Sequence, residues 1–399
     1  MADVRPFRAL RPRADLAADV IAPPYDVLSE AEARAIAENR RSFVRITRSE
    51  VDLEAGADPH SDRAYAQARR NLDAFVAEGI LVEDSAPTYS FYGQTMGSHT
   101  QVGILGAASV DEYDRGLVAK HELTRPDKED DRTHHMDVLD AQVGLVFLAY
   151  RPSASLDRLT AEVTAARPQW QVTTEDGVVH RLWVAPPDAV PRVQEAFAGV
   201  RKLYVADGHH RSAAASRIHA DRHSDTSAHF LAGLHPSDRL LVLAYNRVVA
   251  DRRGLTADGL RAALSRTYEV VEEGRNQPRR KGEVAVYADR KWTTWRTRGA
   301  VEIADPVAGL DVSILQDRVL RPHLGVDDPR TSDRITFVGG IRGVPALEKA
   351  VGDGPGVAFH LFPTSLDELF AVADAGRIMP PKSTWFEPKL REGVVVRRL

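Results

Sequence analysis

The chain has 399 residues, of which 43% are hydrophobic and 28% are charged, and its formal net charge is −4. This composition is typical of a soluble globular protein with two or three lobes, and it excludes a disordered or fibrous chain. The slight acidic excess argues against a dedicated DNA-binding protein, which is usually basic over at least one domain. Because there is no cysteine, disulfides, thiolate metal sites and a cysteine nucleophile are excluded.

The sequence shows neither a secretory signal nor a membrane span. Residues 1–16 include four arginines but no apolar stretch, which a secretory signal requires. The longest apolar runs, such as 240–245, are far shorter than the ~20 residues that cross a bilayer. We therefore expect a cytoplasmic protein with no membrane partner.

Helices and strands are mixed along the whole chain. Ser29 and Glu32 form a capping-box pattern that predicts a helix up to Asn39, and an apolar face predicts a second helix over 62–78. Apolar runs predict strands over 88–92, 101–108, 144–150, 178–185, 202–206, 230–234, 240–248, 284–287, 292–297 and 358–362. Further helices are predicted over 212–220, over 310–320, where Pro322 should end the helix, and over 366–375. The mixture predicts an α+β or mixed α/β fold.

Two loop regions suggest how the chain is divided. One lies near 152–155 and the other, proline-containing and basic, near 275–282. They predict an N-terminal α/β lobe over 1–152, a central lobe over 153–275 and a C-terminal α/β lobe over 276–399. A single integrated fold is the alternative.

The strongest motif is Ala-Asp-Gly-His-His-Arg at 206–211, which follows an apolar strand and precedes an alanine-rich helix. Gly208 permits a tight turn, and the first turn of the helix, at Ser212, offers unpaired N–H groups that attract anions. Arg211 is placed to hold a phosphate through two N–H groups. Asp207 can bind a metal ion or orient a neighbour. The alternative is a plain strand–turn–helix in which a histidine fills a gap.

A second cluster, residues 121–135, consists almost entirely of ionisable or hydrogen-bonding side chains. One interpretation is a charged surface loop. The other is a loop that faces a polyphosphate, in which Lys128 and Arg132 neutralise charge and Glu122 is a general base or magnesium ligand. It is not a zinc-protease motif, because Arg125 occupies the position of the second histidine.

Two proline-containing segments complete the candidates. In 380–389, two prolines precede Lys382, Ser383 and Thr384, whose ammonium and hydroxyl groups can bind an anion, although a stiff capping turn explains the pattern equally well. The segment 22–26 is a rigid loop that presents Tyr25 and Asp26, which we expect to contact substrate.

Taken together, the motifs at 22–27, 121–122, 206–211 and 381–389 resemble domain-of-unknown-function family 1015 over nearly the whole chain. The turn at 206–211 also resembles the phosphate-binding turn of the ParB/sulfiredoxin-like superfamily. That superfamily includes chromosome-partitioning proteins that bind and cleave CTP, sulfiredoxins, and free-serine kinases that use ADP or ATP. The resemblance implies a nucleotide-binding core of that type, with phosphate contacts from Gly208, His209, His210 and Arg211, and a transfer role for Glu122.

Two departures narrow the choice within this superfamily. No helix-turn-helix follows the motif, which disfavours a DNA-partitioning role and a nucleic-acid partner. The absence of cysteine excludes sulfiredoxin chemistry. The nucleotide-phosphate branch remains.

We therefore predict a phosphotransferase that moves a phosphoryl group between a nucleotide, ADP or ATP, and a small hydroxylated metabolite, with free serine or phosphoserine as the best candidate. Glu122 and Asp207 are the predicted catalytic residues, and Asp207 would hold Mg²⁺. Phosphate and nucleotide contacts are assigned to Gly208, His209, His210, Arg211, Ser212, Lys128, Arg132, Lys382, Ser383 and Thr384. The alternatives are a phosphomonoester (phosphoserine) phosphatase and a non-catalytic nucleotide-binding switch. For transfer, the segments 121–135 and 382–389 should converge on the turn at Gly208.

Overall fold

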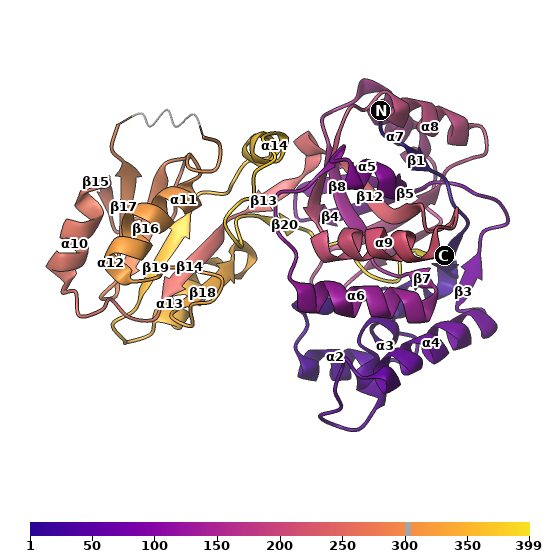
Figure 1. Ribbon diagram of the computed structural model, residues 1–399, viewed down its shortest axis with the longest axis horizontal. Coiled ribbons are helices and arrows are strands. Elements are labelled where there is room, and N and C mark those ends of the chain that lie inside the picture. Colours follow the sequence, from indigo (N-terminus) through magenta and orange to yellow (C-terminus); the bar gives the residue numbers. More distant parts are fainter. Residues whose placement is uncertain (300–304) are drawn as a thin grey trace. The chain divides into compact units, whose positions relative to one another are not determined.

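The computed structural model describes residues 1–299 and 305–399, and it has a mixed α/β fold, as predicted (Figure 1). The chain forms two compact units. Unit 1 comprises Met1–Leu240 together with Pro388–Leu399, and unit 2 comprises Leu241–Glu387. The boundaries expected near 152 and 275 fall inside these units, and the three-lobe division stays a prediction.

Unit 1 is built on a nine-stranded sheet with the strand order β6-β11-β8-β12-β5-β4-β10-β9, in which β1 also pairs with β5. The β6–β11 and β8–β12 pairs are parallel and the others are antiparallel. The strands are β1 (Val4–Arg5), β4 (Ser90–Met96), β5 (His99–Ser109), β6 (Val118–Ala119), β8 (Val146–Tyr150), β9 (Trp170–Thr173), β10 (Val179–Val184), β11 (Leu203–Asp207) and β12 (His229–Pro236).

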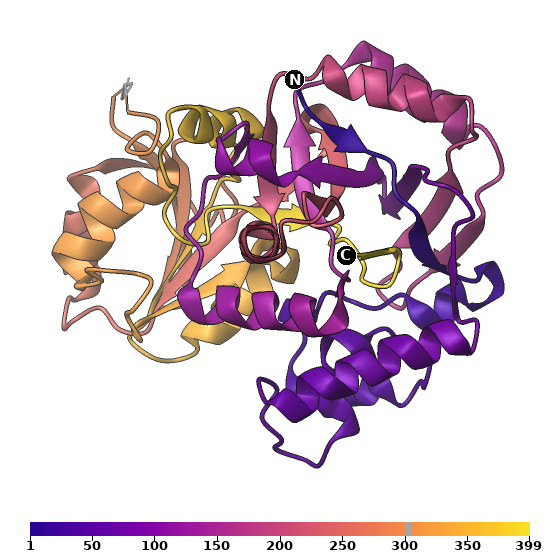
Figure 2. The ribbon, with the colours of Figure 1, turned by 45° about the vertical axis from the view of Figure 1, so that its right-hand side comes forward.

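A second, four-stranded sheet in unit 1 joins segments from distant parts of the chain. Its order is β3 (Leu81–Glu83), β2 (Ala9–Pro12), β21 (Val396–Arg398) and β7 (Ala141–Gln142). The helices of unit 1 are α1 (Ala17–Val20), α2 (Glu30–Ala37), α3 (Val44–Thr47), α4 (Asp62–Ala77), α5 (Val110–Asp114), α6 (Pro126–Leu139), α7 (Ala154–Thr164), α8 (Ala189–Ala198) and α9 (His209–Arg222). Of these, α6 and α9 lie side by side (Figure 1, Figure 2).

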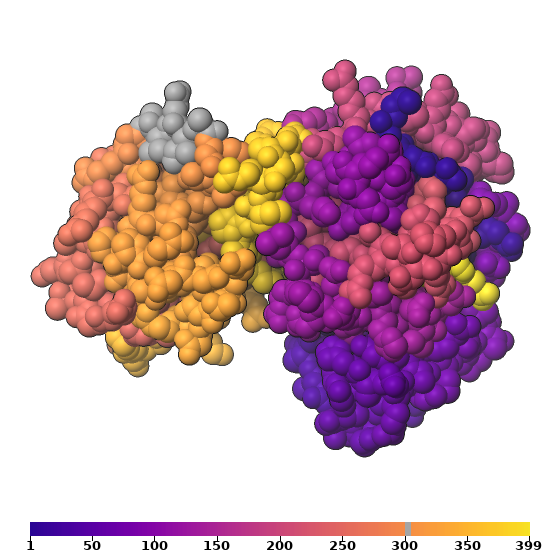
Figure 3. Space-filling view, viewed as in Figure 1, coloured from indigo at the N-terminus to yellow at the C-terminus, as the bar shows by residue number. Residues whose placement is uncertain are grey.

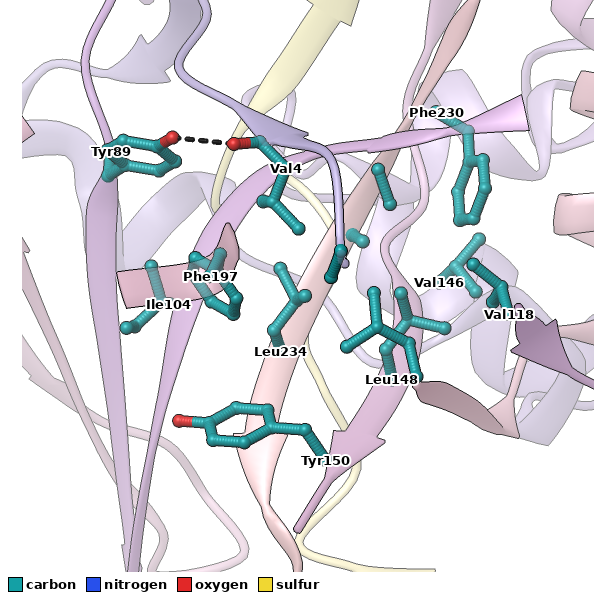
Figure 4. Close-up of a cluster of buried hydrophobic side chains, with 14 of the residues drawn as sticks. Val4, Tyr89, Ile104, Val118, Val146, Leu148, Tyr150, Phe197, Phe230 and Leu234 are labelled. Carbon is teal, nitrogen blue, oxygen red and sulfur yellow. Dashed lines mark hydrogen bonds between the residues drawn. The ribbon is translucent and has the colours of Figure 1, made fainter. Parts of the chain in front are cut away.

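Two hydrophobic clusters hold unit 1 together. The larger one packs on the nine-stranded sheet and includes Val4, Leu148, Phe197 and Leu234 (Figure 4). Within it, the hydroxyl of Tyr89 is buried and donates a hydrogen bond of 2.7 Å to the carbonyl of Val4, which satisfies both polar groups. The second cluster lies between the four-stranded sheet and the N-terminal helices and includes Leu10, Phe43, Leu72, Phe75 and Val396.

Unit 2 contains a six-stranded antiparallel sheet with the order β15-β17-β16-β19-β14-β18, and a separate β13–β20 pair. The strands are β13 (Leu241–Leu243), β14 (Tyr245–Val249), β15 (Tyr268–Glu273), β16 (Glu283–Ala288), β17 (Lys291–Thr297), β18 (Ile335–Gly339), β19 (Val357–Leu361) and β20 (Trp385–Glu387). Its helices are α10 (Ala257–Ser265), α11 (Asp311–Leu315), α12 (Arg321–Leu324), α13 (Gly343–Val351) and α14 (Leu366–Asp374).

The structure corrects three local predictions. Most of 121–135 is helical rather than a loop, because Pro126 occupies the first position of α6, where its missing N–H is no loss, and Asp127 and Glu129 place negative charge in the first turn. Helix α9 begins at His209, three residues earlier than expected. The strand expected over 240–248 is divided into β13 and β14.

A fourth correction concerns Pro322, which does not end its helix. The chain passes from α11 through a π-helical turn, Gln316–Leu320, directly into α12. Pro322 therefore falls in the first turn of α12, where proline is tolerated, and the helix ends at Gly325 with a φ of +62°. Among the residues that the structure describes, none of the helices has the length and apolar character needed to span a membrane.

Candidate active site

The predicted strand–glycine–helix turn is present in unit 1. Strand β11 ends at Asp207, Gly208 has a φ of +92° that favours glycine, and α9 begins at the next residue. No side chain caps the N-terminus of α9. The Gly208 carbonyl accepts hydrogen bonds from the N–H groups of Arg211 (2.9 Å) and Ser212 (3.1 Å). The buried hydroxyl of Ser212 donates to the carbonyl of His209 (3.0 Å), so it is engaged within the helix.

Arg211 lies in a slot that two glycines make possible. A Cβ atom at Gly144 would lie 3.1 Å from Cδ of Arg211, and one at Gly208 would lie 3.0 Å from its Nε. A larger residue at either position would therefore displace the side chain. Burial lowers the pKa of Arg211, but the nearby acidic groups, Asp207 foremost, raise it above its ordinary value, so the guanidinium is charged.

Asp207 already has a cationic partner that the sequence did not identify. The ammonium of Lys389 donates a 2.8 Å hydrogen bond to Oδ2 of Asp207, whereas Nη2 of Arg211 lies 3.9 Å from Oδ1. Burial raises the pKa of Asp207, but Lys389 and Arg211 together bring it well below its ordinary value. The carboxylate is therefore ionised and largely neutralised by Lys389.

The predicted magnesium ion does not fit this surrounding. Two cations beside Asp207 repel a divalent ion. In residues 1–299 and 305–399, no group of three or more His, Asp or Glu side chains could hold a metal.

A small cavity opens beside Arg211. Its walls come from the loop that follows Pro24, from helices α3, α6 and α9, from the segment that links β7 to β8, and from the segment that precedes β21. All of these elements belong to unit 1. The polar side chains that line it belong to Tyr25, Thr47, Arg132, His135, Gln142, Arg211 and Glu392. The cavity thus brings together segments separated by up to 367 positions in the sequence.

Arg132 brings a second guanidinium to the cavity. Its Nε and Nη2 atoms lie 2.8 and 2.6 Å from Oδ2 of Asp131, and its guanidinium lies 4.2 Å from the ring centroid of Tyr25. Asp131 is itself held by the hydroxyl of Tyr65 (2.7 Å) and by Nδ1 of His60 (2.9 Å). The position of Arg132 is therefore fixed by a bonded network of buried and half-buried groups.

Glu392 lines the same cavity, and it is not one of the predicted site residues. Its side chain is buried, and no hydrogen-bond partner is found for Oε2. Burial raises the pKa of Glu392 to about 7. Its backbone is paired with Ala22 in both directions, with N–H···O distances of 2.9 and 3.1 Å. The sequence offered one indirect signal, because Glu392 follows the 380–389 motif by three residues.

The predicted residues around Glu122 form a neighbouring cluster. Oε2 of Glu122 lies 4.0 Å from Nδ1 of His209, whose ring packs edge-on against that of His121 at 4.6 Å. Burial lowers the pKa of His121 to about 4 and that of His209 well below its ordinary value, so both rings are neutral. Nε2 of His210 accepts a hydrogen bond of 3.1 Å from the N–H of Arg125. Glu122 is not among the residues that line the cavity.

The exposed faces of α6 and α9 adjoin on the surface of unit 1 (Figure 3), and Lys128 is exposed on α6. Asp26 is also exposed, next to Tyr25. Two of the expected segments thus meet at the turn: the 121–135 segment contributes Arg132 to the cavity, and Lys389 from the 380–389 motif reaches Asp207.

Lys382, Ser383 and Thr384 belong to unit 2. The ammonium of Lys382 lies 5.6 Å from the ring centroid of Tyr245, and the buried hydroxyl of Ser383 donates to the carbonyl of Pro380 (2.7 Å). A role for these three residues in phosphate binding stays a prediction.

Comparisons with known proteins place the chain in a family. A search of curated proteins finds no match. Similar solved structures include SbnI with a C-terminal truncation from Staphylococcus aureus (11% identity, TM-score 0.38, covering 72% of this chain and 84% of that one) and a free serine kinase variant in complex with ADP (13%, 0.36, 71% and 87%). A conserved hypothetical protein from Pyrococcus furiosus is also similar (13%, 0.35, 71% and 90%). At these TM-scores the likeness decides nothing about chemistry. The family model described as "Protein of unknown function (DUF1015)" matches residues 4–313, and the chain belongs to that family, as its motifs predict.

Proposed function

We propose that unit 1 binds a nucleotide through its phosphates and transfers a phosphoryl group to a small hydroxylated metabolite, with free serine as the best candidate. One observation carries the proposal: the guanidinium groups of Arg211 and Arg132 line the same small cavity of unit 1. Two cations on the same small space favour an anion.

The charge of Arg211 is available to such an anion. The ammonium of Lys389 lies 2.8 Å from Oδ2 of Asp207, whereas Nη2 of Arg211 lies 3.9 Å from Oδ1 of the same carboxylate. The guanidinium is charged, because Asp207 and the other nearby acidic groups raise its pKa above the ordinary value, and it lines the cavity, where it can meet an anionic ligand. The glycine slot holds the guanidinium in place before a ligand arrives, which lowers the entropic cost of binding.

The charges around the cavity suit phosphoryl transfer. Phosphoryl transfer depends on positioning and on neutralising charge from several sides, more than on covalent chemistry. Arg211 and Arg132 reach the cavity from two different helices, α9 and α6.

Titration calorimetry with ADP and ATP tests the binding step. Arg211→Ala should weaken affinity by about 10- to 150-fold, the range expected for a hydrogen-bonded charged group, which is about 1.5–3 kcal/mol. Arg211→Lys should recover part of the loss, because a point charge does not reproduce the two-pronged contact. The matched control is Arg217→Ala on the same helix, whose side chain is half exposed and pairs with Asp130 at 2.6 Å. Equal affinity in wild type and Arg211→Ala would contradict the proposal.

The transfer step is tested by following phosphate between nucleotide and serine in both directions. Wild-type protein should form phosphoserine and ADP from serine and ATP, or phosphoserine and AMP from serine and ADP. Release of inorganic phosphate from phosphoserine without nucleotide would instead identify a phosphatase. Tight nucleotide binding without any turnover would identify a nucleotide-binding switch.

A further inference from the structure

One carboxyl group that lines the cavity, that of Glu392, has no role in the function proposed above. Glu392 is 3% exposed, lines the cavity, and has a side-chain oxygen, Oε2, for which no hydrogen-bond partner is found. Buried polar atoms are nearly always hydrogen-bonded, so an orphaned oxygen at a cavity wall marks a place where a ligand can donate. The two hydrogen bonds between the backbones of Glu392 and Ala22 fix the position of the backbone that carries this carboxyl group.

The other acidic groups of the site are less suited to accept a proton from a substrate. Asp207 is bonded to Lys389, and its pKa lies well below the ordinary value, so it is a weak base. Glu122 lies against His209 and outside the cavity lining. Among the described residues that line the cavity, the acidic one is Glu392.

We propose that Glu392 is the general base that takes the proton of the acceptor hydroxyl, an inference that rests on the phosphoryl transfer proposed above. In this step the acceptor oxygen forms a bond to phosphorus. The bond between phosphorus and the bridging oxygen of the nucleotide breaks, and its electron pair leaves with the nucleotide. The hydroxyl proton passes to Oε2 of Glu392, and in the reverse direction the protonated Glu392 returns it.

The surroundings of Glu392 suit this task. Burial raises its pKa to about 7; the hydroxyl of Thr47, the charge of Arg211 and the backbone N–H of Tyr25 oppose the rise, and Asp26 adds to it. A base whose pKa lies near the working pH combines a useful ionised fraction with a strong driving force for proton transfer. Because Glu392 must be ionised to accept the proton, turnover should fall as the pH drops through about 7. The titratable and charged groups that face Glu392 or line its cavity are Tyr25, Asp26, Arg132, His135 and Arg211.

Glu392→Gln, Glu392→Asp and a matched control test this role. Glu392→Gln should bind ADP and ATP as wild type does but lower kcat by about 10²–10⁴-fold, and it should lose the acidic limb of the pH–rate profile. Glu392→Asp keeps the carboxyl on a shorter chain and should keep part of the rate and the acidic limb. The control is Glu112→Gln, another buried glutamate of unit 1, which accepts a hydrogen bond from the N–H of Asp3 (2.9 Å) and lies outside the cavity lining. It should turn over at the wild-type rate.

A second measurement separates this inference from the proposed function. Infrared spectroscopy of the wild-type protein should show a protonated-carboxyl band that titrates near pH 7 and is missing in Glu392→Gln. If wild type binds nucleotide and transfers phosphate but Glu392→Gln does so at the same rate, the base assignment is wrong and the function stands. The same holds if Glu122→Gln, rather than Glu392→Gln, loses turnover. If wild type transfers nothing to any hydroxylated acceptor, the proposed function is wrong and the base role falls with it, while the band still reports how Glu392 titrates.

Discussion

Glu392 in unit 1 and Glu283 in unit 2 are equally buried, at 3% exposed each, yet their surroundings differ completely. The carboxylate of Glu283 accepts hydrogen bonds from three arginine side chains and one backbone N–H, belonging to Arg275, Arg280, Arg296 and Arg279. Burial raises the pKa of Glu283, but these bonds bring it below its ordinary value, whereas Oε2 of Glu392 lacks a partner and that group's pKa rises. Burial alone therefore does not decide what a carboxyl does. A carboxylate whose oxygens are hydrogen-bonded, like that of Glu283, stabilises its unit. A carboxyl that lines a cavity with an unbonded oxygen, like that of Glu392, can accept a proton from a ligand.

The two units also differ in their histidines. Of the fourteen in the chain, His323 and His360 lie in unit 2 and the other twelve lie in unit 1. Burial lowers the pKa of four of those in unit 1 to about 3 or 4, namely His121, His135, His180 and His235. Unit 1, which contains the cavity, thus also contains these buried histidines, which stay uncharged.

Lowering the pH should produce the largest difference in stability between the two units. The four buried histidines keep their folded pKa values near 3 or 4, whereas an unfolded histidine titrates near 6.5. Their contribution to stability is therefore present above about pH 6.5 and is lost as the pH falls, by about 2 kcal/mol each at pH 5. Urea unfolding at pH 8 and pH 5, read by pulsed proteolysis with mass spectrometry, should show a larger loss for unit 1 than for unit 2. Equal losses in the two units would contradict the contrast.

Glu283→Gln should have the next largest effect, and it should act on unit 2. Removing the negative charge leaves Arg275, whose side chain is 10% exposed, with its longer ion pair to Glu272 (3.4 Å), and breaking a buried ion pair typically costs about 3–5 kcal/mol. The same proteolysis assay at pH 8 should show this loss in unit 2. Glu269→Gln, an exposed position on strand β15, is the control and should change stability by less than about 0.5 kcal/mol.

Glu392→Gln should have the opposite sign in unit 1, and its effect should depend on pH. Because folding raises the pKa of Glu392 to about 7, its favourable contribution is complete below the unfolded value and is lost as the pH rises through 7. Glutamine stays neutral at every pH, so the variant should gain up to about 3 kcal/mol over wild type at pH 8 and nothing at pH 4. A variant that is destabilised equally at both pH values would show that Glu392 is a structural carboxylate like Glu283.

Adding one methyl group at a glycine of each unit should give the smallest effects, again with opposite signs. Gly144→Ala places a Cβ atom 3.1 Å from Cδ of Arg211 and should cost unit 1 about 1 kcal/mol, together with a few-fold loss of ADP affinity. Gly259→Ala, in α10, meets only ordinary contacts of 3.4 Å or more and should stabilise unit 2 by about 0.5–1 kcal/mol. Thermal unfolding and calorimetry measure both. Unchanged ADP affinity in Gly144→Ala would argue against the slot.

The features that the sequence predicts correctly are local ones. The capping box of Ser29 and Glu32 needs only four residues and is present in α2, and the strand–turn–helix around Gly208 requires only its immediate neighbours. Helix α6 was missed because its polar and charged side chains leave no apolar stripe, so that packing against α9 and α4, rather than periodicity, holds it.

The parts of the site that were missed depend on contacts between distant residues. Lys389 reaches Asp207 across 182 positions, and Glu392 pairs its backbone with Ala22. Nothing in the residues around Lys389 or Glu392 specifies these partners, because the contacts depend on how segments that are distant in the sequence pack together. The slot for Arg211 is of the same kind, since Gly144 carries no chemical group to suggest a role and matters only because a side chain must pass it.

Unit 1 is discontinuous in sequence, and this has a consequence for how the protein is made. The segment that supplies Lys389, Glu392 and strand β21 leaves the ribosome after the whole of unit 2. Unit 2 is therefore the first of the two whose residues are all available to fold during synthesis, although it begins later in the chain. A nascent chain interrupted before Pro388 would carry unit 2 intact together with a unit 1 that lacks its inner strand, the counter-ion of Asp207 and the cavity's carboxyl. The complete candidate site thus exists only in molecules whose translation has passed both units.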